Sequence, residues 1–329
     1  MNKILSRLKD AVKDLFAGKK VDLVIGYEDG SIPFRSRPCF VSSADSADKL
    51  VWNYTCTNNL TVYLPRYFQA RKKGDEKPPK IGIVVKGCDA RSVVGLLKEH
   101  QIPRENVIII GMPCTGMADT GRVEAALDGD DIVSCEEGFD GTLEVTTSSG
   151  GKKTLKIEDV IARACLECSH PLPEGADVQI EGKSRGASDK RYDKVMEFEA
   201  KSPDERWQYF IDEISKCIRC HACRQVCPNC YCKVCFVDQT KPRWVGASDD
   251  ISDVILYHIV RLFHQAGRCV ECDACVAACP MGINLRLFAQ KLGKDVQELF
   301  GYVPGLSVEE LPPLCAFKQD DNQSFITKP

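Results

Sequence analysis

Eight of the nineteen cysteines in this 329-residue chain fall into two runs of identical spacing, C-x-x-C-x-x-C-x-x-x-C-P. The spacing is typical of bacterial proteins that bind cubane iron–sulfur clusters, where the last cysteine of each run completes the other run's cluster. We therefore expect two [4Fe–4S] clusters with crossed ligands. The expected ligands are Cys217, Cys220, Cys223 and Cys279 for cluster 1, and Cys269, Cys272, Cys275 and Cys227 for cluster 2.

Three further thiols follow the first run within a few residues: Cys230, Cys232 and Cys235. Two clusters already have their eight ligands, so these three are surplus. Cysteines often pack simply as small apolar side chains. Three so close together favour a further metal site, with a fourth ligand from elsewhere in the chain.

Cys165 and Cys168 form a C-x-x-C pair that Pro171 and Pro173 follow. Such a pair is typical of a redox dithiol, half of a zinc site or half of a cluster site. The prolines favour a rigid metal-binding loop. We expect a further [4Fe–4S] cluster on Cys88, Cys114, Cys165 and Cys168, with Cys56 and Cys135 as competing ligands. The alternative is a few buried thiols and one unrelated pair.

The elements that position Cys88 and Cys114 are two buried apolar runs, 80–86 and 106–111, separated by a helical pattern over 90–100. A strand–helix–strand unit is right-handed in almost every case, so we expect these strands to be parallel. Asp89 is the expected cap of the helix. Both cysteines then follow carboxyl ends of neighbouring strands, where ligands bind in open α/β sheets. Other expected elements are an amphipathic helix over 4–16, strands over 21–26 and 38–41, helical structure over 44–52 and a hairpin over 141–157.

This alternation predicts an α/β domain with a partly parallel sheet over 1–175. A polar, glycine-rich stretch predicts a linker over 176–202. Helical patterns over 203–215, 250–266 and 284–299 flank the two cysteine runs. We therefore expect a mainly α-helical ferredoxin domain over 203–329 that binds the two clusters, because 41 residues separate Cys227 from Cys269 and a compact β-containing ferredoxin has no such insertion.

Composition excludes several other classes of protein. The formal net charge of −3 gives no reason to expect a nucleic-acid partner. No apolar run approaches the ~18 residues that a membrane span needs, and no secretory signal opens the chain. Thiols at metal-ligand spacing indicate a reducing compartment, so we expect a cytoplasmic protein, with an anaerobe as its natural source. A P-loop and a G-x-G-x-x-G fingerprint are both absent.

Three short motifs together resemble the beta-subunit family of coenzyme F420 hydrogenases and dehydrogenases, which includes formate dehydrogenase beta subunits. They are Lys86-Gly87-Cys88-Asp89-Ala90-Arg91, Gly111-Met112-Pro113-Cys114 and Cys165-x-x-Cys168. The resemblance covers most of residues 20–180. The C-terminal third, with its two cysteine runs, resembles the helical di-cluster ferredoxin modules of heterodisulfide-reductase-type complexes. The chain thus resembles a fusion of the two.

The resemblance implies an iron–sulfur electron-transfer subunit of an anaerobic multi-subunit oxidoreductase, such as a hydrogenase, formate dehydrogenase or heterodisulfide-reductase-like complex. Its partners would be other subunits of that complex, flavoproteins among them, and ferredoxin. The alternative is a catalytic subunit that binds FAD and exchanges hydride with a deazaflavin or nicotinamide coenzyme. Lys86 and Arg91 are then candidate contacts for flavin or phosphate at a helix start, although a capped helix explains the same residues.

Overall fold

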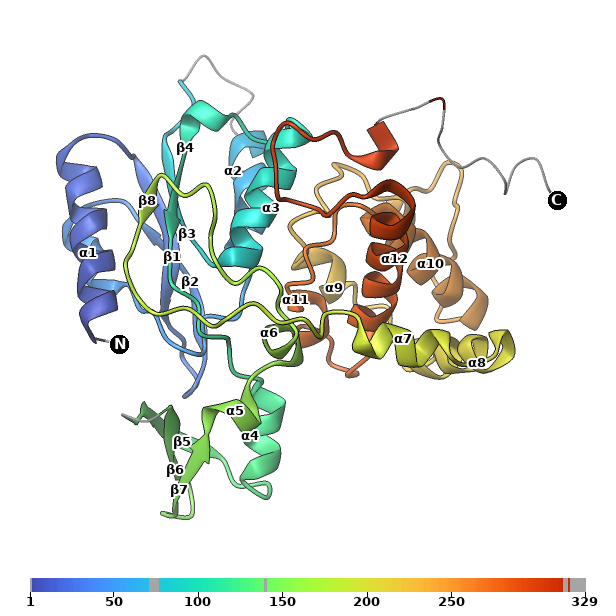
Figure 1. Ribbon diagram of the computed structural model, residues 1–329, viewed down its shortest axis with the longest axis horizontal. Helices are drawn as coiled ribbons and strands as arrows, with labels where there is room; N and C mark the ends of the chain where they lie inside the picture. Colours follow the sequence, from blue (N-terminus) through green and yellow to red (C-terminus); the bar gives the residue numbers. More distant parts are fainter. Residues whose placement is uncertain (1, 71–76, 139–140, 316–318, 320–329) are drawn as a thin grey trace. The chain divides into compact units, whose positions relative to one another are not determined.

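Five strands form a mixed sheet in the computed structural model, which describes residues 2–70, 77–138, 141–315 and 319 (Figure 1). The strand order is β2-β1-β3-β4-β8. The antiparallel partner of β1 is β2, and all other neighbours are parallel, which confirms the predicted partly parallel sheet. The strands are β1 (Leu23–Asp29), β2 (Ser36–Val41), β3 (Ile81–Val85), β4 (Val107–Gly111) and β8 (Val178–Gln179).

The parallel pair β3 and β4 is joined through α3 (Gly87–Lys98). Every residue of β3 is buried, as expected for a strand covered on both faces. The expected role of Asp89 as the helix cap is wrong in register, because α3 begins at Gly87. Asp89 lies at the third helical position and accepts the backbone N–H of Lys86 at 3.1 Å. It thus reaches back to the helix start, as the acidic residue of a capping box does.

Helix α1 (Asn2–Ala17) buries its apolar stripe, with Leu8 and Val12 fully inaccessible. This confirms the expected amphipathic helix. The helical pattern over 44–52 is a 3-10 helix, η1, which is shorter than expected. The remaining short helices of this part of the chain are η1 (Asp45–Lys49), η2 (Leu60–Val62), α2 (Tyr63–Ala70) and η3 (Arg104–Asn106).

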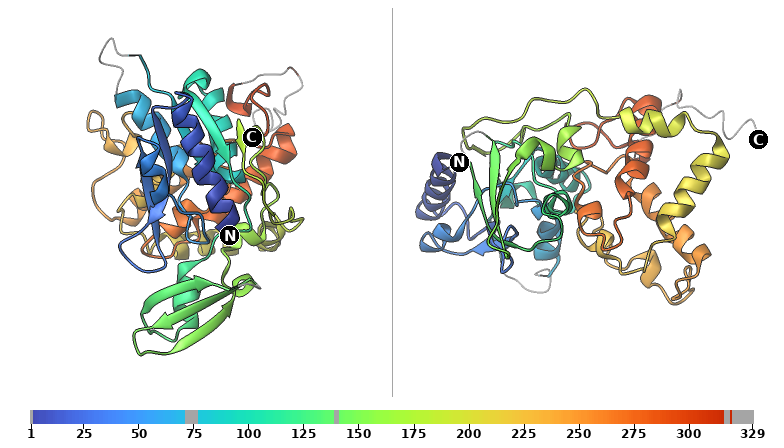
Figure 2. Two further views of the ribbon diagram at one scale, coloured as in Figure 1. Left: turned by 90° about the vertical axis from the view of Figure 1, so that its left-hand side faces the viewer. Right: turned by 90° about the horizontal axis from the view of Figure 1, so that it is seen from below.

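A second, three-stranded antiparallel sheet has the order β5-β6-β7 (Figure 2). The expected hairpin over 141–157 corresponds to β6 and β7, and β5 is an additional strand. Val123 and Leu143 are fully buried in the core of this region, with Val160 beside them. The elements are α4 (Thr120–Ala126), β5 (Ile132–Glu137), β6 (Thr142–Thr147), β7 (Lys152–Lys156), α5 (Ile157–Val160) and α6 (Arg163–Leu166).

The C-terminal part is helical and rich in cysteines, as predicted. Its apolar core includes Phe198, Phe210, Leu262 and Phe288. A capping box of Ser202 and Glu205 begins α8. The helices are α7 (Asp193–Glu199), α8 (Pro203–Ile214), α9 (Ala222–Gln225), η4 (Phe236–Asp238), α10 (Ile251–Gln265), α11 (Ala274–Ala277), α12 (Leu285–Phe300) and η5 (Pro313–Cys315).

The chain divides into two compact units. The first comprises Met1–Ala90 and Ile102–Lys190, and the second comprises Arg91–Gln101 and Arg191–Pro329. The linker predicted over 176–202 contains β8 and α7. The predicted domain over 203–329 includes 316–318 and 320–329, which lie outside the described residues. Among the helices of the described residues, none has the length and apolar character that a bilayer span requires.

Candidate metal centres

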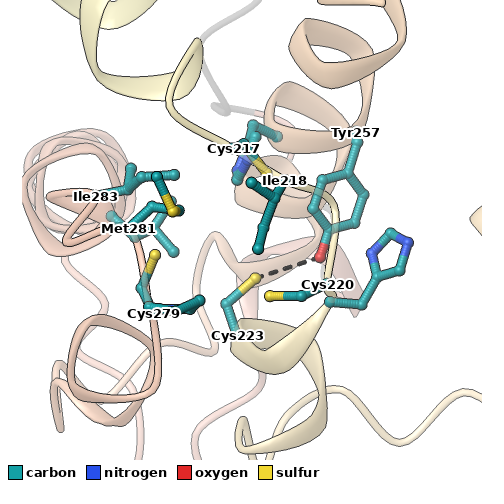
Figure 3. A pocket seen from close by; sticks show the side chains of 12 residues that line it. Cys217, Ile218, Cys220, Cys223, Tyr257, Cys279, Met281 and Ile283 are labelled. Atoms are coloured by element: carbon teal, nitrogen blue, oxygen red, sulfur yellow. Dashed lines mark hydrogen bonds between the residues drawn. The ribbon is translucent and has the colours of Figure 1, made fainter. Parts of the chain in front are cut away.

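The four thiols expected to hold cluster 1 line one pocket of the second unit (Figure 3). Cys217, Cys220 and Cys223 come from the first run, and Cys279 comes from the second run, just after α11. Burial raises the pKa of Cys217, and the neighbouring thiols of Cys223, Cys220 and Cys279 add to the rise. The fold therefore brings together the four residues that the crossed pattern assigns to cluster 1.

The thiols expected to hold cluster 2 are also neighbours. Burial raises the pKa of Cys269 to about 12, and Cys272 and Cys227 contribute to this shift. Burial likewise raises the pKa of Cys275, on which Cys269, Cys227 and Cys272 all act. Cys227 belongs to the first run, so this group is crossed in the same way. That the two groups bind iron–sulfur clusters stays a prediction.

The two cysteine runs share an unusual backbone conformation. Arg219 donates its backbone N–H to the Cys217 sulfur at 3.3 Å, and Glu271 donates its own to the Cys269 sulfur at 3.4 Å. Concave turns with left-handed residues direct backbone N–H groups at anions, iron–sulfur centres included. The left-handed residues lie at the same two positions of each run: Arg219 (φ 54°), His221 (φ 57°), Glu271 (φ 59°) and Asp273 (φ 64°).

The wall of the cluster 1 pocket includes two polar side chains from α10. The Tyr257 hydroxyl lies 3.3 Å from the Cys223 sulfur, which Figure 3 marks with a dashed line. His258 is 1% exposed, and neither ring nitrogen has a hydrogen-bond partner among the described residues. Burial and the nearby Arg261 charge lower the pKa of His258 to about 4, so the imidazole is neutral at pH 7. Ile218 and Met281 are exposed apolar residues of the same pocket.

Two further polar residues of α10, Arg261 and Gln265, contact the first cysteine run. Arg261 donates from Nη2 to the backbone oxygen of Cys223 at 3.0 Å. The Gln265 amide lies 3.5 Å from the sulfurs of both Cys227 and Cys230. Sequence reasoning did not single out Tyr257, Arg261 or Gln265. The sequence signal for these three residues was their four-residue spacing, which places them on one face of the helix.

The surplus thiols after the first run lie at different places. Cys230 is beside Cys227, and a hydrogen bond between the two thiols lowers the pKa of Cys230. Cys235 acts electrostatically on Cys230 and accepts a hydrogen bond from Arg224. Cys232 is exposed. The structure thus brings Cys230 to the cluster 2 group, and the separate metal site predicted for these three thiols stays a prediction.

The first unit gathers another group of thiols past the carboxyl ends of β3 and β4. Burial raises the pKa of Cys114 to about 12, and Cys165 and Cys168 act on it electrostatically. Cys88 lies in the first turn of α3. Its neighbour Gly87 abuts the chain just after Cys168, because an added Cβ would come within 2.7 Å of the Pro171 carbonyl carbon and still closer to the His170 oxygen. Cys114, Cys165 and Cys168 therefore lie close together, and Cys88 follows the residue at which α3 meets the loop after Cys168.

The two competing ligands lie in other surroundings. The Cys56 thiol is fully buried within its own loop, 3.7 Å from the Asn53 side-chain oxygen. Cys135 is on β5 and packs against the apolar core of the three-stranded sheet. Among the described contacts, neither thiol is paired with Cys114. None of the nineteen cysteines, all of which lie within the described ranges, forms a disulfide bond.

Lys86 and Arg91, the candidate flavin or phosphate contacts, are both buried and engaged within the fold. The Lys86 ammonium lies 2.8 Å from Asp89 Oδ2 and donates to the backbone oxygens of Cys56 and Asn58. Burial lowers the pKa of Lys86, but the charges of Asp89, Tyr27 and Cys88 and the hydrogen bond to Asp89 together hold the pKa above its usual value. Arg91 itself belongs to the second unit, where it donates to the backbone oxygens of Pro304 and Val270. A flavin role for either residue stays a prediction.

The donor sets decide which kind of metal centre the site suits. No three or more His, Cys, Asp or Glu side chains of the described residues stand ready to hold a single metal ion. A four-iron cluster keeps its four thiolate ligands further apart than one ion does. Sets of four thiols are the ligands of such clusters. The crossed groups of four thiols, with backbone N–H donors to sulfur, therefore fit the ligand chemistry of [4Fe–4S] clusters.

Comparison with known proteins adds four findings. Residues 79–201 match the family described as the C terminus of the coenzyme F420 hydrogenase/dehydrogenase beta subunit. The F420-dependent formate dehydrogenase subunit beta of Methanocaldococcus jannaschii is 23% identical, over 92% of this chain and 92% of its own length. The F420-dependent formate dehydrogenase 1 subunit beta of Methanococcus maripaludis is 24% identical, over 89% of this chain and 88% of its own.

Among solved structures, a chain of the F420-reducing [NiFe] hydrogenase complex from Methanosarcina barkeri is similar at a TM-score of 0.40 and 14% identity. The match covers 66% of this chain and 90% of that one. The region 79–201 contains all of Lys86–Arg91, Gly111–Cys114 and the pair Cys165 and Cys168, the motifs on which the resemblance was based.

Proposed function

We propose that this chain, which matches the coenzyme F420 hydrogenase/dehydrogenase beta-subunit family over residues 79–201, is an iron–sulfur subunit that relays single electrons within an oxidoreductase complex. The two relatives are named as beta subunits of F420-dependent formate dehydrogenases. By that likeness, the partners of this chain are the other subunits of a formate dehydrogenase, hydrogenase or heterodisulfide-reductase-like complex, and ferredoxin.

The observation that carries the relay proposal is the crossed grouping of eight thiols in the second unit. Cluster 1 would be held by Cys217, Cys220, Cys223 and Cys279, and cluster 2 by Cys269, Cys272, Cys275 and Cys227. When bound, [4Fe–4S] clusters supply one-electron redox chemistry. The residues around them supply N–H donors to sulfur from Arg219 and Glu271. This is the ferredoxin module of the proposed fusion.

We extend the proposal to a third cluster in the first unit, on Cys88, Cys114, Cys165 and Cys168. The grouping of Cys114, Cys165 and Cys168 supports it, as does the close approach of Gly87, the neighbour of Cys88, to the loop after Cys168. Gly116 brings the chain after Cys114 close to Cys165: its φ of 108° favours glycine, and an added Cβ would lie 3.3 Å from Cys165 Cβ. Each unit of the chain would then hold at least one cluster.

The catalytic alternative requires a flavin. The Lys86 ammonium contacts the Tyr27 hydroxyl, Asp89 and two backbone oxygens, so its hydrogen-bond donors are already engaged within the fold. This favours the relay over a flavin site built on Lys86. Flavin content separates the two functions directly. Anaerobically purified protein with iron and sulfide but no flavin supports the relay, whereas flavin in a 1:1 ratio to the chain supports the catalytic alternative.

The experiment that tests the relay uses the full chain, purified without oxygen. We expect about eight irons per chain for two clusters and about twelve for three. Electron paramagnetic resonance of the reduced protein should show that Cys279→Ala and Cys217→Ala remove the same signal, and that Cys227→Ala and Cys269→Ala remove the other. Cys315→Ala is the matched control and should keep every signal. Protein without iron, or signals lost run by run, would overturn the assignment.

A further inference from the structure

Helix α10 presents a row of polar side chains to the cysteine groups of the second unit. Tyr257, Arg261 and Gln265 are four residues apart, so they lie on one face of the helix. Each contacts the first cysteine run: Tyr257 at the Cys223 sulfur, Arg261 at the Cys223 backbone oxygen, and Gln265 at the sulfurs of Cys227 and Cys230. One helix face therefore touches a predicted ligand of each cluster.

Arg261 is the charged member of this row. It is 5% exposed, and no carboxylate of the described residues forms an ion pair with it. Its Nε atom has no hydrogen-bond partner among the described residues. A buried guanidinium without a counter-charge is strongly unfavourable, because burial removes its hydration. An anionic group bound beside Arg261 would remove this cost.

The groups that surround Arg261 are thiols from both crossed sets. Cys275, Cys227, Cys223 and Cys230 all lie close enough to interact with the Arg261 charge, and the Cys223 backbone oxygen is 3.0 Å from Nη2. Cys223 belongs to the cluster 1 set, while Cys227 and Cys275 belong to the cluster 2 set. A single fixed positive charge is thus within electrostatic reach of both groups.

We propose that Arg261 is a shared counter-charge for the two clusters, raising the reduction potential of both. The inference rests on the proposed function, because it requires the clusters to be bound. One-electron reduction adds a negative charge, and a positive charge nearby in a poorly polarisable interior stabilises the reduced form more than the oxidised form. Arg261 is not a predicted ligand. It would act on the clusters only through its charge, and it is therefore a positioning residue.

The competing explanation is structural: Arg261 only tethers the first cysteine run through the Cys223 backbone oxygen. Potentials separate the two roles, because loss of a tether lowers the iron content and leaves the potential of each assembled cluster where it was. Two substitutions of Arg261 test whether its positive charge is what matters. Arg261→Lys keeps the positive charge and loses the guanidinium, and Arg261→Gln keeps a hydrogen-bond donor and loses the charge.

The test is a redox titration of the anaerobically purified full chain, followed by electron paramagnetic resonance, with iron content measured on each sample. We expect Arg261→Gln to lower the equilibrium constant for reduction of both clusters at least tenfold, which for a one-electron couple is about 59 mV. Arg261→Lys should restore most of this loss. The matched control is Lys194→Gln, which removes a surface charge paired with Glu197 in the same unit and should shift neither potential.

A second variant serves if Arg261→Gln does not assemble clusters. Gln265→Glu places a carboxylate one turn from Arg261 and beside Cys227, and it should lower the potential of cluster 2 in the same direction. Unchanged potentials in either variant at full iron content would overturn the role of Arg261, as would a shift confined to one cluster in Arg261→Gln. A wild-type chain without any iron–sulfur signal would instead refute the proposed function, so the two failures are distinguishable.

Discussion

Arg219 and Glu271 carry opposite charges and have the same backbone conformation, with φ of 54° and 59°. Each lies two residues after the first cysteine of its run, and each donates its backbone N–H to that cysteine's sulfur. The side chains have different partners, because Arg219 donates to backbone oxygens and Glu271 pairs with Arg191. The shared conformation therefore follows from the sulfur contacts and not from the side chains.

Asp273 is the second left-handed residue of its run, at φ 64°. A β-branched side chain is strongly disfavoured in this conformation, at a cost of about 1–2 kcal/mol. We expect Asp273→Val to lower the thermal midpoint of unfolding of the chain and the amount of iron bound as cluster 2. The matched variant Asp273→Gly should keep the iron content of wild type, because glycine adopts positive φ without strain. Equal losses in both variants would show that the carboxylate matters and not the backbone.

Arg191 and Glu271 form a pair in which both side chains are about nine-tenths buried, with Arg191 Nε 3.0 Å from Glu271 Oε1. Burial raises the pKa of Glu271, but the hydrogen bonds and charge of Arg191 outweigh it and hold the pKa below its usual value. Arg191→Met leaves a buried carboxylate uncompensated, so we expect it to lower the free energy of unfolding by about 3–5 kcal/mol. The double variant Arg191→Met/Glu271→Leu should recover most of that loss.

The pH dependence of this pair has a definite sign. Because the pKa of Glu271 is lower in the folded chain, its contribution is fully present above the pKa of the unfolded chain, about 4.3, and is lost as the pH falls through the lowered value. The difference in thermal midpoint between wild type and Arg191→Met should therefore shrink on acidification below about pH 4.3. A difference that stays constant down to pH 3 would contradict the ionic account of the pair.

The sequence predicted those parts of the fold in which apolar residues follow a strong periodic or continuous pattern. The buried runs of β3 and β4 and the crossover between them placed Cys88 and Cys114 at the same sheet edge. The cap was misplaced by register, because α3 begins at Gly87, a residue with poor helix propensity that gives no start signal. The two-residue strand β8 inside the predicted linker is too short for any pattern, and it is recognisable only by its pairing with β4.

The cysteine groups were predictable because their spacing is itself the signal. The crossed partners Cys279 and Cys227 followed from the same rule. Arg261 and His258 could not be assigned in that way, since a sequence gives the face of a helix and not the thiols that the face meets. Their burial without described partners for Nε and for the imidazole nitrogens becomes visible only in three dimensions.

Tyr257 offers a test that is specific to one cluster, because its hydroxyl contacts the Cys223 sulfur at 3.3 Å. Hydrogen bonds to sulfur are among the factors that set cluster potentials. We expect Tyr257→Phe to lower the reduction potential of cluster 1 by the equivalent of about 1 kcal/mol, the net worth of one hydrogen bond. Cluster 2 should not respond. The control is Tyr209→Phe, whose hydroxyl contacts Asn284 instead, and equal shifts of both clusters would refute the contact's role.

The last prediction compares two glycines of the same helix, α3. An alanine at Gly87 would place its Cβ against the backbone at His170 and Pro171, which cannot move aside as a side chain can. At Gly95 the nearest atom to an added Cβ is the Asn229 side-chain oxygen at 4.0 Å, so an alanine fits there. Helix propensity alone favours alanine over glycine by about 0.5–1 kcal/mol at either position.

We therefore expect Gly95→Ala to raise the thermal midpoint slightly and to keep every iron–sulfur signal. Gly87→Ala should lower the midpoint and separate the start of α3 from the loop after Cys168. If Cys88 and Cys168 share a cluster, the third signal and its four irons must be lost in Gly87→Ala while the crossed pair of the second unit persists. A destabilised Gly87→Ala chain that retains about twelve irons would show that these thiols do not depend on the close approach at Gly87.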